Sequence, residues 1–365
     1  MDFMLKNCQM AKVIALKIVS DLNAKRWINN SMSLKAIRSI EDCCDCITFI
    51  TVNYNSTSKV LKLISSIRSH TKNAKIIVID NASTDNARWL LNQASDLNLI
   101  CVFNRTNMGF GAANNIGVKL AETPLIVMVN PDALFDQSTN ICLYFKENLD
   151  KNEVGIVAPR IFYPDGMIQP NFSLRYSNIQ TFIPQLLSLG AVFRFFNEWK
   201  FITGLLGYLG RFFFGSAGQE YVNRFTCADD KQSCSWVSGA CFGIRKELFN
   251  QIGGFDDRFF LYSEDEDLCR RVQMYGKKII YAPEVRVFHE VGGTHANSGS
   301  IGTLGRADAY RIESCLIYLK KYTDSGWGRV KWSYIIVALL RLVLSFSIVM
   351  SPRRSFRLLT RLVLI

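Results

Sequence analysis

The feature that most constrains this chain is an alternation of short apolar runs with helix-like segments, in which polar residues follow the runs. The apolar runs have the length and composition of buried strands, and they lie at residues 47–52, 76–79, 99–103 and 125–129. Strands that alternate with helices predict a mostly parallel sheet with helices on both faces. Ligands of such sheets bind beyond the carboxyl ends of the strands. Asn53, Asp80 and Asp132 all fall at such ends, so the sequence predicts a ligand site at that edge.

Positive charge is the second constraint. The chain carries a formal net charge of +12, which suits nucleic acid, an anionic membrane or a phosphate-bearing substrate. Four arginines crowd the C-terminal end beside a long apolar run, at Arg353, Arg354, Arg357 and Arg361. This placement favours a membrane surface over nucleic acid, and no nucleic-acid-reading motif is recognisable.

The apolar run at Trp332–Met350 is almost as long as the ~20 residues that span a bilayer. Arg341 lies in its middle, where a charged side chain costs about 2.5–3.5 kcal/mol on insertion scales. We therefore prefer a helix that lies in the membrane plane, with a spanning helix as the alternative. The segment 323–365 is accordingly predicted to be helical and to associate with a membrane.

The rest of the sequence predicts one main domain with an N-terminal appendage and an insertion. Residues 1–45 are predicted to be a leader or loose helix, since lysines interrupt any signal-peptide core. The main domain is predicted at 46–322. Its apolar insertion at 180–216 either covers a groove, contacts lipid or forms a buried helix pair. Eleven cysteines without a framework fit a reducing cytosol, and the pair Cys43 and Cys46 lacks the second pair of a zinc site.

A cluster of acids at 264–267 is the clearest candidate for chemistry. Ser263 and Glu266 have the spacing of a capping box, which places Asp265 in the first turn of a helix. The helix is predicted to end at Gly276 and to bury one apolar face, formed by Leu268, Val272 and Tyr275. One or two acids would merely complement the helix dipole. Four in succession exceed that need, and crowded carboxylates have raised pKa values that suit a general base.

Asp132 is the candidate for binding a cation. It follows Asn130 and Pro131 after a buried strand, where its carboxylate could hold a hard cation that bridges phosphates. The alternative is a plain turn aspartate. His289 follows another strand-like run and could supply a nitrogen ligand to the same metal, although a lone histidine is more often structural.

A glycine-containing loop at 107–114 is the remaining motif. Asn114 stands where the dinucleotide fingerprint requires glycine, so a nicotinamide-dependent dehydrogenase is disfavoured. The glycines are instead expected to let the backbone approach a nucleotide or a neighbouring strand.

Taken together, these segments resemble the family-2 glycosyltransferases of the GT-A fold. The resemblance spans roughly residues 46–322, and its motifs lie at 51–56, 78–85, 107–117, 130–132, 253–256 and 264–268, ending at His289. The variant with Asn-Pro-Asp and Gly-Gly-Phe-Asp is similar to bacterial rhamnosyltransferases that build surface polysaccharides. The implied fold is α/β, with a single Rossmann-like, mostly parallel sheet flanked by helices.

The resemblance implies an inverting transfer of a sugar, with rhamnose from dTDP-rhamnose favoured, to a hydroxyl of a lipid-linked saccharide. It implies Asp265 as the base, Asp132 as a ligand of the diphosphate and of a divalent metal, Mg²⁺ or Mn²⁺, and His289 as a contact of the metal or the diphosphate. Asn130 replaces the first acid of the family's Asp-x-Asp motif, which leaves a single carboxylate there. The implied donor-binding residues are Thr51, Asn53, Asp80, Asn107, Gly109, Asn114 and Asp132. The implied acceptor-side residues are Trp236, Asp256 and Glu264.

Two other functions fit the same residues. One is a membrane-associated nucleotide-sugar binding protein without catalysis, and the other is a nucleotidyltransferase. The predicted location is cytoplasmic, with the protein peripheral or monotopic on the inner membrane.

Overall fold

The computed structural model describes residues 45–71, 73–94, 97–136, 140–177, 229–290, 306–322 and residue 332. Nearly all of the predicted leader, the whole of the insertion at 180–216 and all but one residue of the segment 323–365 lie outside these ranges. The predictions made for those segments stay predictions.

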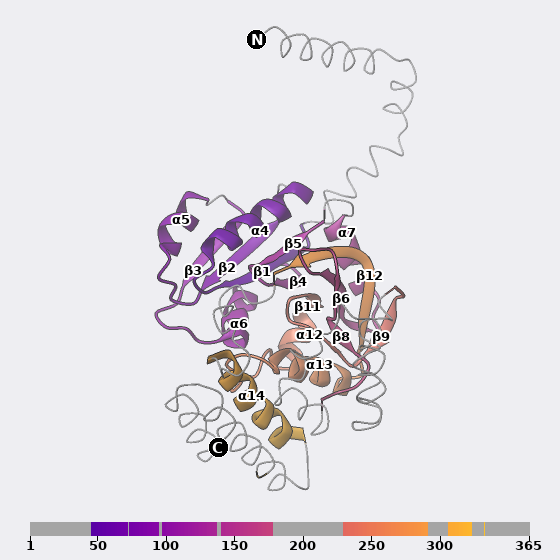
Figure 1. The fold of residues 1–365 in the computed structure, drawn as a ribbon. Helices are drawn as coiled ribbons and strands as arrows, with labels where there is room; N and C mark the ends of the chain where they lie inside the picture. The colour runs from indigo at the N-terminus through magenta and orange to yellow at the C-terminus, as the bar shows by residue number, and fades with distance from the viewer. Residues whose placement is uncertain are drawn as a thin grey trace, which may run out of the picture.

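The N-terminal half of the fold is the predicted alternation of strands and helices (Figure 1). Its elements are β1 (Ile47–Asn53), α4 (Thr57–His70), β2 (Lys75–Asp80), α5 (Ala87–Gln93), β3 (Leu99–Phe103), α6 (Phe110–Leu120) and β4 (Leu125–Val129). The strands pair in the order β3-β2-β1-β4, and each neighbouring pair is parallel. The apolar runs therefore correctly predicted the strands, and Asn53 lies beside Asp80 at the shared carboxyl edge.

The C-terminal half extends the same sheet with strands of both directions. Its elements are β5 (Ala133–Phe135), α7 (Ile141–Leu149), β6 (Val154–Phe162), β7 (Ile168–Gln169), β8 (Phe172–Ser173), β9 (Gln232–Cys234), β10 (Trp236–Val237), β11 (Cys241–Arg245), α12 (Lys246–Gln251), α13 (Glu264–Met274), β12 (Lys278–His289) and α14 (Arg306–Tyr322). The order continues β4-β11-β6-β12-β5. Strands β6 and β12 are parallel, whereas β11 and β5 join antiparallel. The architecture is an α/β fold in which helices cover both faces of one central sheet.

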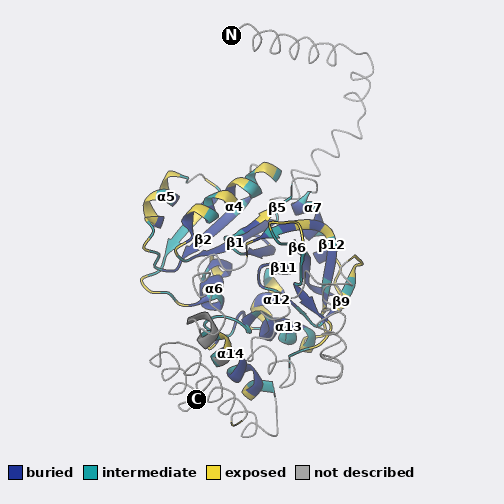
Figure 2. Cartoon of the chain, viewed as in Figure 1, coloured by how far each residue is buried: buried dark blue, intermediate teal, exposed yellow. Residues whose placement is uncertain are grey.

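Alternation along the strands divides the core into two layers. Phe49 and Val127 face α4, α5 and α7 on one side, whereas Ile50 and Met128 face α6, α12 and α13 on the other. Side chains of successive strand residues point to opposite faces, so a sheet buried on both faces needs continuous apolar runs. Figure 2 shows the strands buried and the outer sides of α4 and α5 exposed.

Helix α13 begins and ends where the acid cluster and Gly276 predicted, but two details of the prediction are wrong. Ser263 makes no side-chain capping bond, because its backbone adopts a left-handed conformation with φ of 62°. Tyr275 is 49% exposed, because it follows the last turn of the helix. Cys269 is buried with Leu268 and Val272 instead.

Among the described helices, none is long and apolar enough to cross a membrane.

Candidate active site

The carboxyl edge of β1 and β2 is a network of buried polar side chains. Asn53 is fully buried, and its Nδ2 lies 2.8 Å from Asp80 Oδ1, 2.8 Å from Thr57 Oγ1 and 3.2 Å from Ser83 Oγ. The backbone amide of Ser83 donates to the other oxygen of Asp80. These bonds fix the carboxylate of Asp80 in one orientation at the end of its strand, where the prediction places the donor.

A second network orders the loop before α6. Asn81 Nδ2 donates to Asn107 Oδ1 and to the carbonyl of Gly109, at 3.1 and 2.9 Å. Asn107 Oδ1 in turn accepts from the amide of Gly109 at 2.9 Å. Gly109 has a φ of +88°, and a Cβ there would lie 2.3 Å from the carbonyl oxygen of Phe260. The glycine therefore permits a close approach to the loop before α13, rather than to a strand, and ties the two halves of the site together.

Two of the predicted donor-binding residues lie deeper. Asn114 is buried in α6, and its Nδ2 donates to the carbonyl of Phe110. Thr51 lies within β1, two positions before Asn53, and its buried hydroxyl has no hydrogen-bond partner among the described residues. These positions do not test a role in nucleotide binding, so that role stays a prediction for both residues.

Asp132 and His289 lie side by side, as predicted for two ligands of one metal. The antiparallel pairing of β5 with β12 sets Ala133 opposite His289, and this brings His289 Nε2 to 3.2 Å from Asp132 Oδ1. The other ring nitrogen of His289 lies 3.1 Å from Gln169 Oε1. With Nδ1–H donating to Gln169, Nε2 carries a lone pair, which accepts from Asn130 Nδ2 at 3.2 Å and lies beside Asp132.

This pair fits one edge of a metal's coordination shell. Adjacent ligands at the Mg²⁺ distance of about 2.1 Å lie about 3 Å apart in an octahedron, close to the observed separation. No group of three or more His, Cys, Asp or Glu side chains suited to a metal occurs in the described part of the chain. The remaining positions would fall to substrate oxygens and water, which is how Mg²⁺ is usually held beside phosphates.

A cavity of about 330 Å³ lies next to this pair. It is lined by residues from several elements, including Asn130, Arg175, Trp236, Gly239, Tyr262, Glu264, Asp265, His289 and Arg311. The cavity therefore joins the acid cluster of α13 to the metal-ligand candidate His289. A sugar could contact both at once.

Asp265 is held in this cavity by backbone amides. One oxygen accepts from the amide of Gly239 at 2.8 Å, and the other accepts from the amide of Glu266 at 2.8 Å. Burial raises the pKa of Asp265, although these two backbone bonds act in the opposite direction. A fixed carboxylate with a raised pKa is suited to accept a proton from a hydroxyl.

The neighbouring acids are also poorly solvated. Burial, and then the charge of Asp265, raise the pKa of Glu264 well above its ordinary value. Its Oε2 is buried without a hydrogen-bond partner among the described residues. Burial also raises the pKa of Glu266 to about 7, against the opposing bond from the amide of Ser177. The predicted direction is confirmed, but its main cause is burial rather than mutual repulsion.

The three predicted acceptor-side residues do not all line the cavity. Trp236 and Glu264 line the cavity, whereas Asp256 lies outside it. Arg258, and with it Lys321, holds the pKa of Asp256 well below its usual range. Its carboxylate pairs with both of these side chains.

Several residues in the cavity or beside His289 escaped prediction from the sequence. Gln169 lies on a strand of only two residues, too short for any periodic signal. Arg175 and Arg311 line the cavity from segments distant in sequence from α13. Tyr262 has a φ of 72° beside the 62° of Ser263, and paired left-handed residues without glycine leave no mark in composition.

Comparisons with known proteins indicate the class of protein to which the chain is similar. The model of "Glycosyl transferase family 2" matches residues 48–214, and that of "Glycosyl transferase family group 2" matches residues 185–364. An N-acetylglucosaminyl-diphospho-decaprenol L-rhamnosyltransferase of Mycobacterium tuberculosis is 23% identical over 86% of this chain and 96% of its own length. Rhamnosyltransferase WbbL of Escherichia coli is 23% identical over 75% of this chain and 93% of its own.

Among solved structures, a mannosyltransferase from Pyrobaculum calidifontis, in complex with GDP-Man and Mn²⁺, has a TM-score of 0.46 at 16% identity. The match covers 87% of this chain and 79% of that one.

The chain is thus a glycosyltransferase, and it is similar to those of family 2. Within that family it is similar to bacterial rhamnosyltransferases.

Proposed function

We propose that this enzyme transfers a sugar, with rhamnose favoured, from a nucleotide-diphosphate donor to a hydroxyl of a lipid-linked saccharide. The observation that carries the proposal is the cavity in which the carboxylate of Asp265 and the ring of His289 face one substrate-sized space. A base and a candidate diphosphate-binding group are the parts that such a transfer needs.

The expected reaction follows from their positions. Asp265 accepts the proton of the acceptor hydroxyl, and the hydroxyl oxygen forms a bond to the anomeric carbon of the donor. The bond from that carbon to the diphosphate breaks on the opposite side, so the configuration inverts. A divalent metal held by Asp132 and His289 would offset the negative charge that develops on the leaving diphosphate.

The donor and acceptor are proposed from the relatives. The relative from M. tuberculosis is named for a rhamnosyl transfer to N-acetylglucosaminyl-diphospho-decaprenol, and it aligns over most of both chains. We propose dTDP-rhamnose as the donor and an N-acetylglucosaminyl-diphospho-polyprenol as the acceptor. The product would serve the synthesis of a cell-surface polysaccharide.

Membrane association is a separate part of the proposal. The support for it is the basic, apolar sequence of 323–365 and the lipid anchor of the proposed acceptor. We propose a peripheral or monotopic protein on the cytoplasmic face of the inner membrane. Removal of residues 332–365 should release the protein from anionic vesicles. Vesicle binding that persists after truncation would instead implicate the insertion at 180–216.

The test is a transfer assay by mass spectrometry. Purified protein is mixed with a panel of nucleotide sugars and N-acetylglucosaminyl-diphospho-lipid acceptors, with and without Mg²⁺ or Mn²⁺. We expect a mass increase of one deoxyhexose with dTDP-rhamnose. The Asp265→Asn variant is the control that separates an enzyme from a binding protein, because it should bind nucleotide without transfer. Transfer of another sugar would refute the proposed donor, and release of diphosphate would indicate a nucleotidyltransferase.

A further inference from the structure

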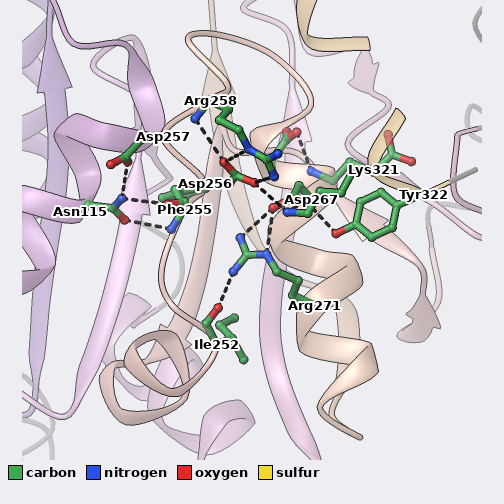
Figure 3. A network of polar contacts seen from close by, with 12 residues as sticks. Asn115, Ile252, Phe255, Asp256, Asp257, Arg258, Asp267, Arg271, Lys321 and Tyr322 are labelled. Atoms are coloured by element: carbon green, nitrogen blue, oxygen red, sulfur yellow. Dashed lines mark hydrogen bonds and ion pairs between the residues drawn. The ribbon is translucent and has the colours of Figure 1, made fainter. Parts of the chain in front are cut away.

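Helix α14 is fastened to α13 by a buried cluster of charges (Figure 3). Lys321 Nζ lies 2.6 Å from Asp267 Oδ1 and 2.8 Å from Asp256 Oδ2. The hydroxyl of Tyr322 donates to the same Asp267 oxygen at 2.7 Å. Asp267 is fully buried. One ammonium group of α14 therefore bridges two carboxylates, one on α13 and one in the loop before it.

The second oxygen of Asp267 is also occupied. Arg271, one turn along α13, contacts Asp267 Oδ2 through Nε at 2.9 Å and through a guanidinium nitrogen at 2.8 Å. Another nitrogen of Arg271 donates to the carbonyl of Ile252 at 2.7 Å. A buried carboxylate with both oxygens paired is stable only while every partner is present, because loss of one leaves charge uncompensated.

The cluster lies in the same helical turn as the base. Asp267 follows Asp265 by two residues in the first turn of α13. Residues two apart point to nearly opposite sides of a helix. Asp265 thus faces the cavity while Asp267 faces α14. A displacement of this turn by the cluster would move the base by a similar amount.

Helix α14 also supports the backbone that leads into this turn. Ser314 donates to the carbonyl of Leu261 at 2.8 Å, and the ring of Tyr310 lies 4.5 Å from that of Phe260. Tyr262, the residue after Leu261, adopts a left-handed conformation. Such conformations in residues other than glycine persist only where surrounding contacts enforce them, and α14 supplies contacts on this side.

From this arrangement we propose that Lys321 is a positioning residue for catalysis. Its ammonium bridges Asp256 and Asp267, and so fixes the first turn of α13 and the base that this turn carries. Lys321 touches no reacting atom. Its effect on transfer passes through Asp267 and the backbone of α13. The catalytic part of this inference rests on the proposed function, whereas the effect on α13 does not.

Lys321→Met tests the proposal, with the exposed neighbour Lys320→Met as the matched control. A base misplaced by about 1 Å can cost up to about 100-fold in rate, so we expect kcat for Lys321→Met to fall at least about tenfold. KM for the donor should stay unchanged, because Asn53 and Asp80 are held by bonds within the donor edge. Lys321→Arg should recover most of the rate. Lys320→Met should match the wild type.

Hydrogen exchange provides a readout that does not need activity. The amides of 264–269 should exchange about tenfold faster in Lys321→Met, since local opening of this turn becomes easier. Exchange in β1 and β2 should not change. Unchanged exchange at 264–269, or an unchanged kcat in an active preparation, would overturn the proposal. A rise in donor KM equal to the loss in kcat would indicate general loosening and would also overturn it.

Two other outcomes are a variant that does not fold and a wild type that transfers no sugar. If Lys321→Met does not fold, Tyr322→Phe takes its place, because it removes only the hydroxyl that donates to Asp267. The same changes are then expected at roughly a third of the size, in line with the loss of one hydrogen bond to a charged group. If the wild type transfers no sugar, the proposed substrates are wrong, and hydrogen exchange alone decides the role of Lys321.

Discussion

The two ends of the site satisfy their polar groups in opposite ways. At the donor edge, Asn53 and Asp80 are buried but bonded to each other and to their neighbours. At the start of α13, Glu264 is buried with an unpartnered oxygen, and burial raises the pKa values of Glu264 and Asp265. The donor edge is a rigid frame, whereas the start of α13 holds acids in an unfavourable environment.

This difference between the donor edge and the start of α13 bears on where the proposed proton transfer takes place. A frame of satisfied hydrogen bonds costs little and holds a ligand in register. Buried acids with raised pKa values cost stability, and proteins retain such features mainly where function requires them. The contrast therefore supports the proposed roles, with binding at the edge of β1 and β2 and proton transfer at α13. The following predictions test this assignment.

The largest effect is expected at the base. Asp265→Asn should lower kcat about 1,000-fold, since general bases contribute about 10²- to 10⁴-fold. Nucleotide affinity should be unchanged, because the donor edge is intact. Transfer kinetics and calorimetric nucleotide titration measure the two quantities. A variant that keeps more than a tenth of wild-type kcat would break the contrast.

A smaller loss is expected at the junction of the two ends. Asp132→Ala should reduce transfer about 100-fold, the upper range for loss of support at a metal site, and should abolish stimulation by Mg²⁺ or Mn²⁺. The amide of Glu290 donates to the backbone carbonyl of Asp132, so the turn should persist in the variant. Donor titrations at increasing metal concentration provide the measurement. Metal stimulation equal to that of the wild type would exclude Asp132 as a ligand.

At the donor edge the expected effect is on stability. Asn53→Ala leaves Asp80 Oδ1 without its donor and should lower the free energy of unfolding by about 3 kcal/mol, as for a broken buried network. Urea denaturation compares it with Asn250→Ala, at an exposed position on α12. Equal stability of the two variants would mean that the frame is not cooperative.

The smallest effect is a gain of stability at the acid cluster. The folded-state pKa of Glu266 is about 7 against 4.5 for the ordinary group. The native state therefore loses stability as pH rises from 4.5 to 7, while the unfolded state ionises freely. Glu266→Gln avoids this loss and should be more stable than the wild type by about 2 kcal/mol at pH 8, but not at pH 4. Thermal unfolding at both pH values, with the exposed Glu153→Gln as control, is the measurement. A gain at both pH values would point to packing rather than charge.

Part of the fold and of the candidate site follows from local patterns in the sequence. The strands β1 to β4 are continuous apolar runs, and their burial on both faces follows from composition alone. Asp265 lies in the first turn of its helix because the acids and Gly276 mark where α13 begins and ends. Polar residues at the ends of β1 and β2 follow from strand length. These features depend on neighbours in the chain, so the sequence by itself determined them.

Other features depend on residues that meet only in the folded chain. His289 reaches Asp132 because the short strand β5 pairs antiparallel with β12, and a strand of three residues has no periodicity to detect. The raised pKa of Asp265 follows from burial, which several distant segments create together. Lys321 meets Asp267 only where α14 packs on α13. The sequence therefore determined the strands, helix α13 and the candidate for the base, whereas the tertiary structure decided which charges share a site, because proximity and desolvation arise only from packing.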